Sequence, residues 1–232
     1  SVSKRPMPNN IKTTKGFYKT FSPSDLSLIS EEEALKKYEN TEGGAEKYIE
    51  NHLKNKWYRV KDHSGEDWIW NNSGPGSFGI PAPLFHKYFT DLVKYGANNS
   101  GRPLKKGETP TGEEKFYDVT IKFIGFPKLN KLTKITKNGL EPLKDNQVEL
   151  FPKLTQKVRA FGYLHGAQRG SNTDYDPRFN LNNTAFYRIF DPGDIIQFEP
   201  DANDSFTITF IKKNSSQAKK YPYSDHAYGE LE

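Results

Sequence analysis

Hydrophobic and polar residues alternate along several short segments of this 232-residue chain. The clearest segment is 116–124, where Val119, Ile121 and Phe123 fall on one face and Asp118 and Lys122 on the other. Comparable patterns predict further strands over 57–60, 67–70, 148–151, 157–164, 185–190, 194–198 and 205–211. Short strands at this spacing, separated by turn residues, favour a mainly β fold, a mostly antiparallel barrel or sandwich with short helices.

Three segments have helical periodicity instead. Ser30 and Glu33 form a capping box, which predicts a short helix that ends near residue 40. A second helix is expected over 45–53. A third is expected over 82–95, because apolar residues recur there every three or four positions after Pro81.

These patterns divide the chain into four parts. Residues 1–24 lack periodicity and are expected to form a basic arm, and residues 25–56 an acidic, helical accessory segment. Residues 57–213 carry the strand pattern and are expected to form the main domain, followed by a loosely held polar tail at 214–232. Because the strand pattern begins at Trp57, we expect that removal of residues 1–54 leaves a folded domain.

The composition supports a folded core and excludes several classes of protein. Cysteine is absent, which excludes a disulfide scaffold and a cysteine-ligated metal site. Sixteen Phe, 13 Tyr and 3 Trp supply large apolar side chains, and we expect Trp57, Trp68, Trp70 and Phe123 to fill the core rather than to stack on bases. No apolar run approaches the roughly 18 residues that a membrane span needs, so no membrane partner is expected.

Charge is unevenly distributed along the chain. Residues 25–50 contain eight acidic residues and three lysines, so the rest of the chain carries a charge of +10 although the formal net charge is only +5. The basic excess lies in four stretches, 1–20, 86–106, 128–144 and 153–178. Such stretches raise the hypothesis of polyanion binding, while lysine-rich surfaces also occur merely because they are soluble.

Catalytic motifs are not evident. The sequence contains no HExxH, GxSxG or phosphate-binding GK[ST] motif, and its five histidines are far apart. Residues 113–115, Glu-Glu-Lys, match half of a metal-dependent nuclease motif, but they lie in a loop before a predicted strand rather than on one. We therefore assign no catalytic residue, no metal ligand and no cofactor from the sequence.

Two polar loops are candidates for contact with DNA bases. The first loop, residues 71–79, contains three glycines that permit a close approach of its backbone to a partner, and Asn71, Asn72 and Ser77 as polar contacts. The second loop, residues 163–183, is long for a connection in a compact domain. Its side chains suit base edges: His165, Gln168, Arg169, Asn172, Asp174, Asp176 and Arg178. A plain turn and a solvated loop are the alternatives for these two segments.

Several motifs occur in the order found in a known family. Residues 74–81, GPGSFGIP, followed by Leu84, Phe85, Tyr88 and Phe89, resemble the glycine-rich arm, Ile-Pro step and short helix of the EcoRII restriction endonuclease N-terminal effector domain. Residues 192–198, PGDIIQF, and the strand over 205–211 resemble the strand pair that closes its pseudobarrel, which is similar to the plant-type B-three DNA-binding pseudobarrel. The likeness covers about residues 57–213. The helices over 30–54 and the lysine-rich stretch over 125–150 have no counterpart in it.

The resemblance implies a sequence-specific domain that binds double-stranded DNA in the cytoplasm, as part of a restriction endonuclease whose catalytic domain is not in this chain. The two loops would enter the major groove from either side. Basic residues would hold the phosphates, namely Arg59, Lys61, Arg102, Lys105 and Lys106. The alternatives are a metal-dependent nuclease that acts by itself and a carbohydrate-binding β-module, which would explain the many aromatic residues and polar loops.

Overall fold

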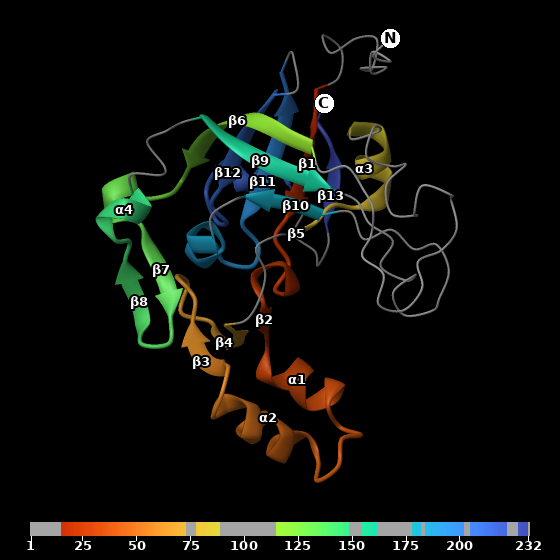
Figure 1. The fold of residues 1–232 in the computed structure, drawn as a ribbon, viewed down its shortest axis with the longest axis vertical. Coiled ribbons are helices and arrows are strands. Elements are labelled where there is room, and N and C mark those ends of the chain that lie inside the picture. The colour runs from red at the N-terminus through yellow and green to blue at the C-terminus, as the bar shows by residue number, and fades with distance from the viewer. Residues whose placement is uncertain are drawn as a thin grey trace.

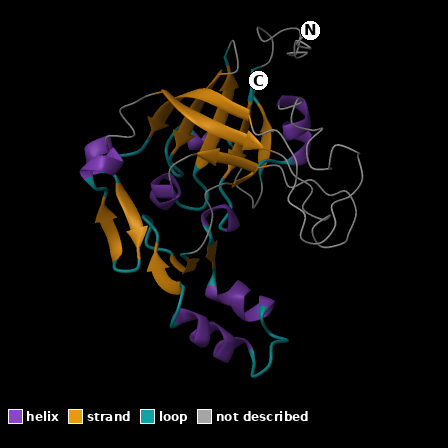
Figure 2. Ribbon diagram, viewed as in Figure 1, coloured by secondary structure: helices purple, strands orange, loops and turns teal. Residues whose placement is uncertain are grey.

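The computed structural model describes residues 15–72, 78–88, 115–148, 155–161, 178–181, 184–201, 205–221 and 227–231. Strands dominate and the helices are short (Figure 2), so the prediction of a mainly β fold with short helices is confirmed. The strands form an eight-stranded sheet, a three-stranded sheet and a two-stranded hairpin.

The eight-stranded sheet carries most of the fold. Its strands lie in the order β13 (Tyr228–Glu230), β1 (Phe17–Thr20), β11 (Ile195–Pro200), β12 (Ser205–Ile211), β6 (Lys115–Ile124), β9 (Thr155–Phe161), β10 (Arg178–Leu181) and β5 (Phe78–Gly79). Neighbouring strands are antiparallel except β12 and β6, which are parallel. The sheet twists and curls (Figure 1), but β13 and β5 end its order, so the strands described here do not close into a barrel.

The smaller elements project from one side of this sheet (Figure 1). The three-stranded sheet has the order β2 (Leu28–Ile29), β4 (Asp67–Asn71) and β3 (Trp57–Lys61), and α1 (Glu31–Lys37) and α2 (Ala45–Leu53) pack beside it. The backbone N–H of Glu33 donates to Ser30 Oγ at 3.1 Å, which confirms the predicted cap. The other pieces are β7 (Thr133–Thr136), β8 (Gly139–Pro142), α3 (Ala82–Tyr88), α4 (Asp145–Val148), and the 3-10 turns η1 (Ser24–Leu26), η3 (Leu129–Lys131), η5 (Thr184–Ile189) and η6 (Ala218–Lys220).

Most of the predicted strands are present. Those over 57–60, 67–70, 116–124, 194–198 and 205–211 correspond to β3, β4, β6, β11 and β12, and the one over 157–164 corresponds to β9 as far as Phe161. One strand prediction was wrong, because residues 184–189 form η5. Of the strand predicted over 148–151, only Val148 is among the described residues, and it ends α4. A short apolar run such as 185–190 suits a buried turn of helix as well as a buried strand, so alternation alone did not separate them.

The expected division of the chain does not match the sheets. Strand β1 comes from the segment expected to be an arm, and it pairs with β11 on one side and β13 on the other. The prediction of an arm was therefore wrong for this part, and the polar tail also supplies a strand. Strand β2 pairs with β4, so the accessory segment completes the small sheet as well. Removal of residues 1–54 would take strands from both sheets, contrary to the expectation of an independent domain from Trp57.

Aromatic side chains fill the core between these elements. Phe17 stacks on Phe198 with ring centroids 4.5 Å apart, and Phe190 stands between Phe21 and Phe210 at 4.9 and 4.5 Å. All five are fully buried. The aromatic residues expected in the core are found there: Trp70 is buried, and Trp57, Trp68 and Phe123 pack against the buried clusters.

Strand β1 provides a test of this architecture. Phe17→Ala is expected to lower the free energy of unfolding by about 3–5 kcal/mol, because it removes a fully buried ring and leaves a cavity beside Phe198. Chemical denaturation measures this loss. Lys15→Ala is the control, because Lys15 is exposed two residues earlier. Equal stability of the two variants would contradict a central role of β1.

Candidate nucleic-acid interface

The two loops proposed from the sequence are attached to neighbouring strands at one edge of the large sheet. Residues 73–77 directly precede β5, and residues 162–177 join β9 to β10. Strands β5 and β10 pair with each other, with Phe78 opposite Phe179 and Gly79 opposite Arg178. Strands β5 and β10 therefore start about 100 residues apart in the sequence but pair in the same sheet, and because they are antiparallel the chain enters them from opposite ends.

The predicted base contacts are only partly within the described residues. Asn71 ends β4, and its backbone N–H donates to Ser27 O at 2.9 Å. Asn72, the next residue, is exposed. Arg178 is the first residue of β10 rather than part of the loop. The other predicted base contacts lie outside the described residues: Ser77, His165, Gln168, Arg169, Asn172, Asp174 and Asp176.

Two of the predicted phosphate contacts are already paired with carboxylates. Arg59 Nη2 donates to Glu50 Oε1 at 2.7 Å and to Glu31 Oε1 at 3.1 Å, and these hydrogen bonds raise the pKa of Arg59. Lys61 Nζ lies 2.6 Å from Asp67 Oδ1. These pairs leave less positive potential at β3 than the sequence suggests. Arg102, Lys105 and Lys106 lie outside the described residues.

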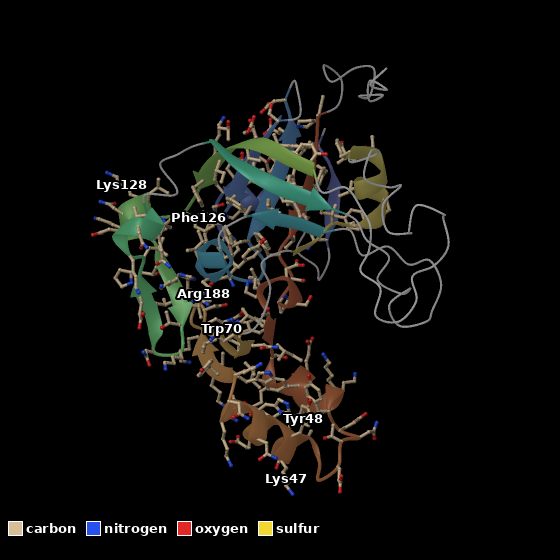
Figure 3. All side chains as sticks on the ribbon, viewed as in Figure 1. Lys47, Tyr48, Trp70, Phe126, Lys128 and Arg188 are labelled. Carbon is tan, nitrogen blue, oxygen red and sulfur yellow. The ribbon has the colours of Figure 1, made fainter. Side chains whose placement is uncertain are left out.

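A different basic region is prominent in the structure. Residues 128–148, which include the β7–β8 hairpin, carry five lysines against two acidic residues. Strand β7 packs against both η5 and β3. At this junction the guanidinium of Arg188 lies over the ring of Trp70, 5.1 Å from its centroid (Figure 3). Arg188 Nη2 also donates to Asn72 Oδ1 at 3.2 Å. Arg188 thereby connects η5 to the start of the first loop.

Lys134 is the most unusual cation of this junction. The residue is only 8% exposed, and its Nζ donates to Gln147 Oε1 at 3.1 Å. Burial lowers the pKa of Lys134, and the positive charges of Arg188 and Lys144 lower it further. Glu141, opposite Lys134 in the β7–β8 ladder, acts in the other direction but does not outweigh them. Positive charge is thus concentrated here rather than neutralised.

The sequence did not identify Lys134 or Arg188 as site residues. Arg188 lies in the segment predicted as a strand, where alternation places it on the same face as Phe190 and thus inside. In η5 it instead stands half-buried between the buried residues Tyr187 and Ile189. Lys134 belongs to the lysine-rich stretch without a counterpart in the resembled family. The basic composition of that stretch indicated a charged surface but not which lysine is covered.

A buried polar network fixes the junction to the large sheet. Asp191 and Asp194 have fully buried side chains on the turn before β11, and Lys212 Nζ at the end of β12 lies 3.0 and 3.1 Å from their carboxylates. Asp194 also accepts from the backbone N–H groups of Asp191 and Lys213. Burial raises the pKa of Asp194 despite these donors.

His63, in the β3–β4 turn, connects this network to the smaller elements. Its Nδ1 lies 2.6 Å from Asp191 Oδ1 and its Nε2 lies 2.9 Å from Thr133 O. Both partners are acceptors, so only the imidazolium form, with N–H on both nitrogens, satisfies them. Burial acts to lower the pKa of His63, but Asp191 and the Thr133 carbonyl outweigh it and raise the pKa above 6.5. Burial alone would raise the pKa of Asp191. His63 and Lys212 outweigh burial and lower this pKa to about 2.

Other kinds of site have no support in the described ranges. Within them, no group of three His, Cys, Asp or Glu residues is arranged to hold a metal ion. No helix found there has the length and apolar character to cross a membrane. Comparison with protein-family models, curated proteins and solved structures gives no match. The functional argument therefore depends on the geometry of this chain alone.

The His63 contacts predict a pH-dependent stability. At pH 6, His63→Gln should lower the free energy of unfolding by about 1–3 kcal/mol, because a buried charged hydrogen bond is lost. The pKa of His63 is raised in the folded state, so this contribution is complete below pH 6.5 and disappears as the pH rises through the raised value. Urea denaturation from pH 5 to 9 should show the two proteins converging at high pH. His52→Gln, on α2, is the control, and a pH-independent difference would contradict the assignment of an imidazolium.

Proposed function

We propose that this chain is a sequence-specific double-stranded DNA-binding domain that recognises bases with its two loops. The observation that carries the proposal is the pairing of β5 with β10, which anchors both loops at one sheet edge. Because the two strands are antiparallel, the chain enters β5 and β10 from opposite ends, which is compatible with two loops that reach one groove from either side. The side chains of both loops suit base edges in the major groove.

The remaining features are compatible with the resembled family. The curled eight-stranded sheet would be the wall of a B-three-like pseudobarrel, and the chain would act as the target or effector domain of a cytoplasmic restriction endonuclease. In that role its partner would be a catalytic nuclease domain outside this chain. Arg188, in η5 beside the basic β7–β8 hairpin, adds positive charge at the start of the first loop, where it donates to Asn72.

Salt dependence is the first test of DNA binding. If roughly five phosphates are neutralised, log Kd against log salt should have a slope of about 4 to 5 in magnitude, because bound counterions are released from the duplex. Fluorescence anisotropy with random and selected duplexes measures it. A carbohydrate-binding module would give a glycan affinity that hardly changes with salt, and metal-dependent cleavage lost in Glu113→Ala would favour an autonomous nuclease. A slope near zero would rule the proposal out.

Arg178 tests base recognition at the foot of the second loop. Arg178→Ala should cost on the order of 1–3 kcal/mol at the preferred site and relax the preference at one base pair, as loss of a bidentate guanine contact does. Lys105→Ala should instead weaken all sequences to a similar extent and reduce the salt slope by about one. Selection from random duplexes distinguishes the two effects. An unchanged consensus for Arg178→Ala would remove this residue from the recognition surface.

A further inference from the structure

Three cations meet where the β7–β8 hairpin, η5 and the three-stranded sheet join. Lys134 lies in β7, Lys144 precedes α4, and Arg188 lies in η5. Gln147 organises the first two, because its Oε1 accepts from Lys134 Nζ at 3.1 Å and from the backbone N–H of Lys144 at 3.0 Å. Trp70 and Asn72 hold the Arg188 guanidinium from the other side (Figure 3). The side-chain cations of Lys134 and Arg188 are thus positioned by neutral groups, whereas Lys144 is held through its backbone and its side chain is exposed.

Within the described residues, no carboxylate comes within 4 Å of these three side-chain cations, and the side-chain hydrogen bonds of Lys134 and Arg188 go to the amides of Gln147 and Asn72. Other cations of the protein differ in this respect: Lys19 is paired with Asp25, Lys212 with Asp191 and Asp194, and Arg59 with Glu50. A covered ammonium with cationic neighbours is unfavourable unless an anion offsets it. Glu141, opposite Lys134, offsets these positive charges only in part, so the arrangement lacks a full anionic partner.

We propose that Lys134, Lys144 and Arg188 form a binding site for one phosphate group, and that this site holds a backbone phosphate of the DNA that the two loops contact. The second part rests on the proposed function. A guanidinium held by stacking keeps its remaining N–H donors free for a bidentate contact with phosphate, and two ammonium groups add point charges.

The location of the site specifies what it does for DNA binding. Arg188 donates a hydrogen bond to Asn72, the second residue of the first loop. A phosphate held at Arg188 would therefore lie beside the start of that loop. It would fix the register of the duplex against the loop without carrying sequence information itself. Lys128, by contrast, is an exposed lysine at the start of η3, above the hairpin and away from Arg188 (Figure 3).

Inorganic phosphate and pyrophosphate test the anion site without DNA. At constant ionic strength, tryptophan fluorescence and thermal unfolding of the full chain should respond to either anion and not to chloride, since Trp70 contacts Arg188. Arg188→Gln and Lys144→Gln should each weaken the response at least tenfold. Lys144 is exposed, so its variant keeps the fold even if Arg188→Gln does not. Lys137→Gln, in the turn of the same hairpin, is the matched control and should change the response less than twofold.

The stability of the free protein separates binding from a structural role. Lys134→Gln removes one of several like charges, so without phosphate its Tm should equal or exceed that of the wild type while its phosphate response falls. A lower Tm together with an unchanged phosphate response would overturn the proposal.

A DNA-binding measurement on the same variants distinguishes failure of this site from failure of the proposed function. The variant with Lys144→Gln and Arg188→Gln should reduce the salt slope of duplex binding by about two and leave the selected consensus unchanged. Normal DNA binding with an unaltered slope would overturn the backbone role while the proposed function stands. A phosphate response without any duplex binding would overturn the proposed function and leave only a site for free phosphate. Absence of both responses would overturn both.

Discussion

Two carboxylates that solvent does not reach determine how this protein is arranged. Asp191 and Asp194 are fully buried three residues apart, so donors must converge on them from elsewhere in the chain. Lys212 does so from the end of β12 and His63 from the β3–β4 turn. Separation of these elements would leave a buried charge unpaired. The small sheet, which leads into the first loop, is therefore held at a defined position on the large one.

The strands that were predicted from the sequence are those in which one face alone is buried. In β6, Val119 and Ile121 are covered and Lys122 is exposed, so alternation is plain. Strand β1 lacks this pattern because Lys19 is 4% exposed and paired with Asp25, a residue six positions later. A lysine in a polar segment indicates a surface, and only the fold provides the partner that permits its burial.

The candidate interface was predicted in outline but not in its charges. The glycine-rich and polar compositions of the two loops were visible in the sequence, yet their common anchor depends on a two-residue strand, β5, too short to leave a periodic pattern. Arg59 looked like a phosphate contact because its carboxylate partners, Glu31 and Glu50, are distant from it in the sequence. They lie on α1 and α2, which pack beside the small sheet. Pairing across elements is invisible to local composition, and the same holds for the cations gathered around Arg188.

The position of β1 has a consequence for how the molecule comes to be folded. Among the described residues, β1 is the first strand, and its partners in the sheet are β11 and β13, which are made much later. During synthesis the side chains of Phe17 and Phe21 therefore stay without their packing partners until β11 has been made. Contacts between such distant segments slow folding and expose apolar surface to aggregation. Folding of this protein should accordingly depend more on slow synthesis and chaperone protection than folding of a sheet built from neighbouring strands.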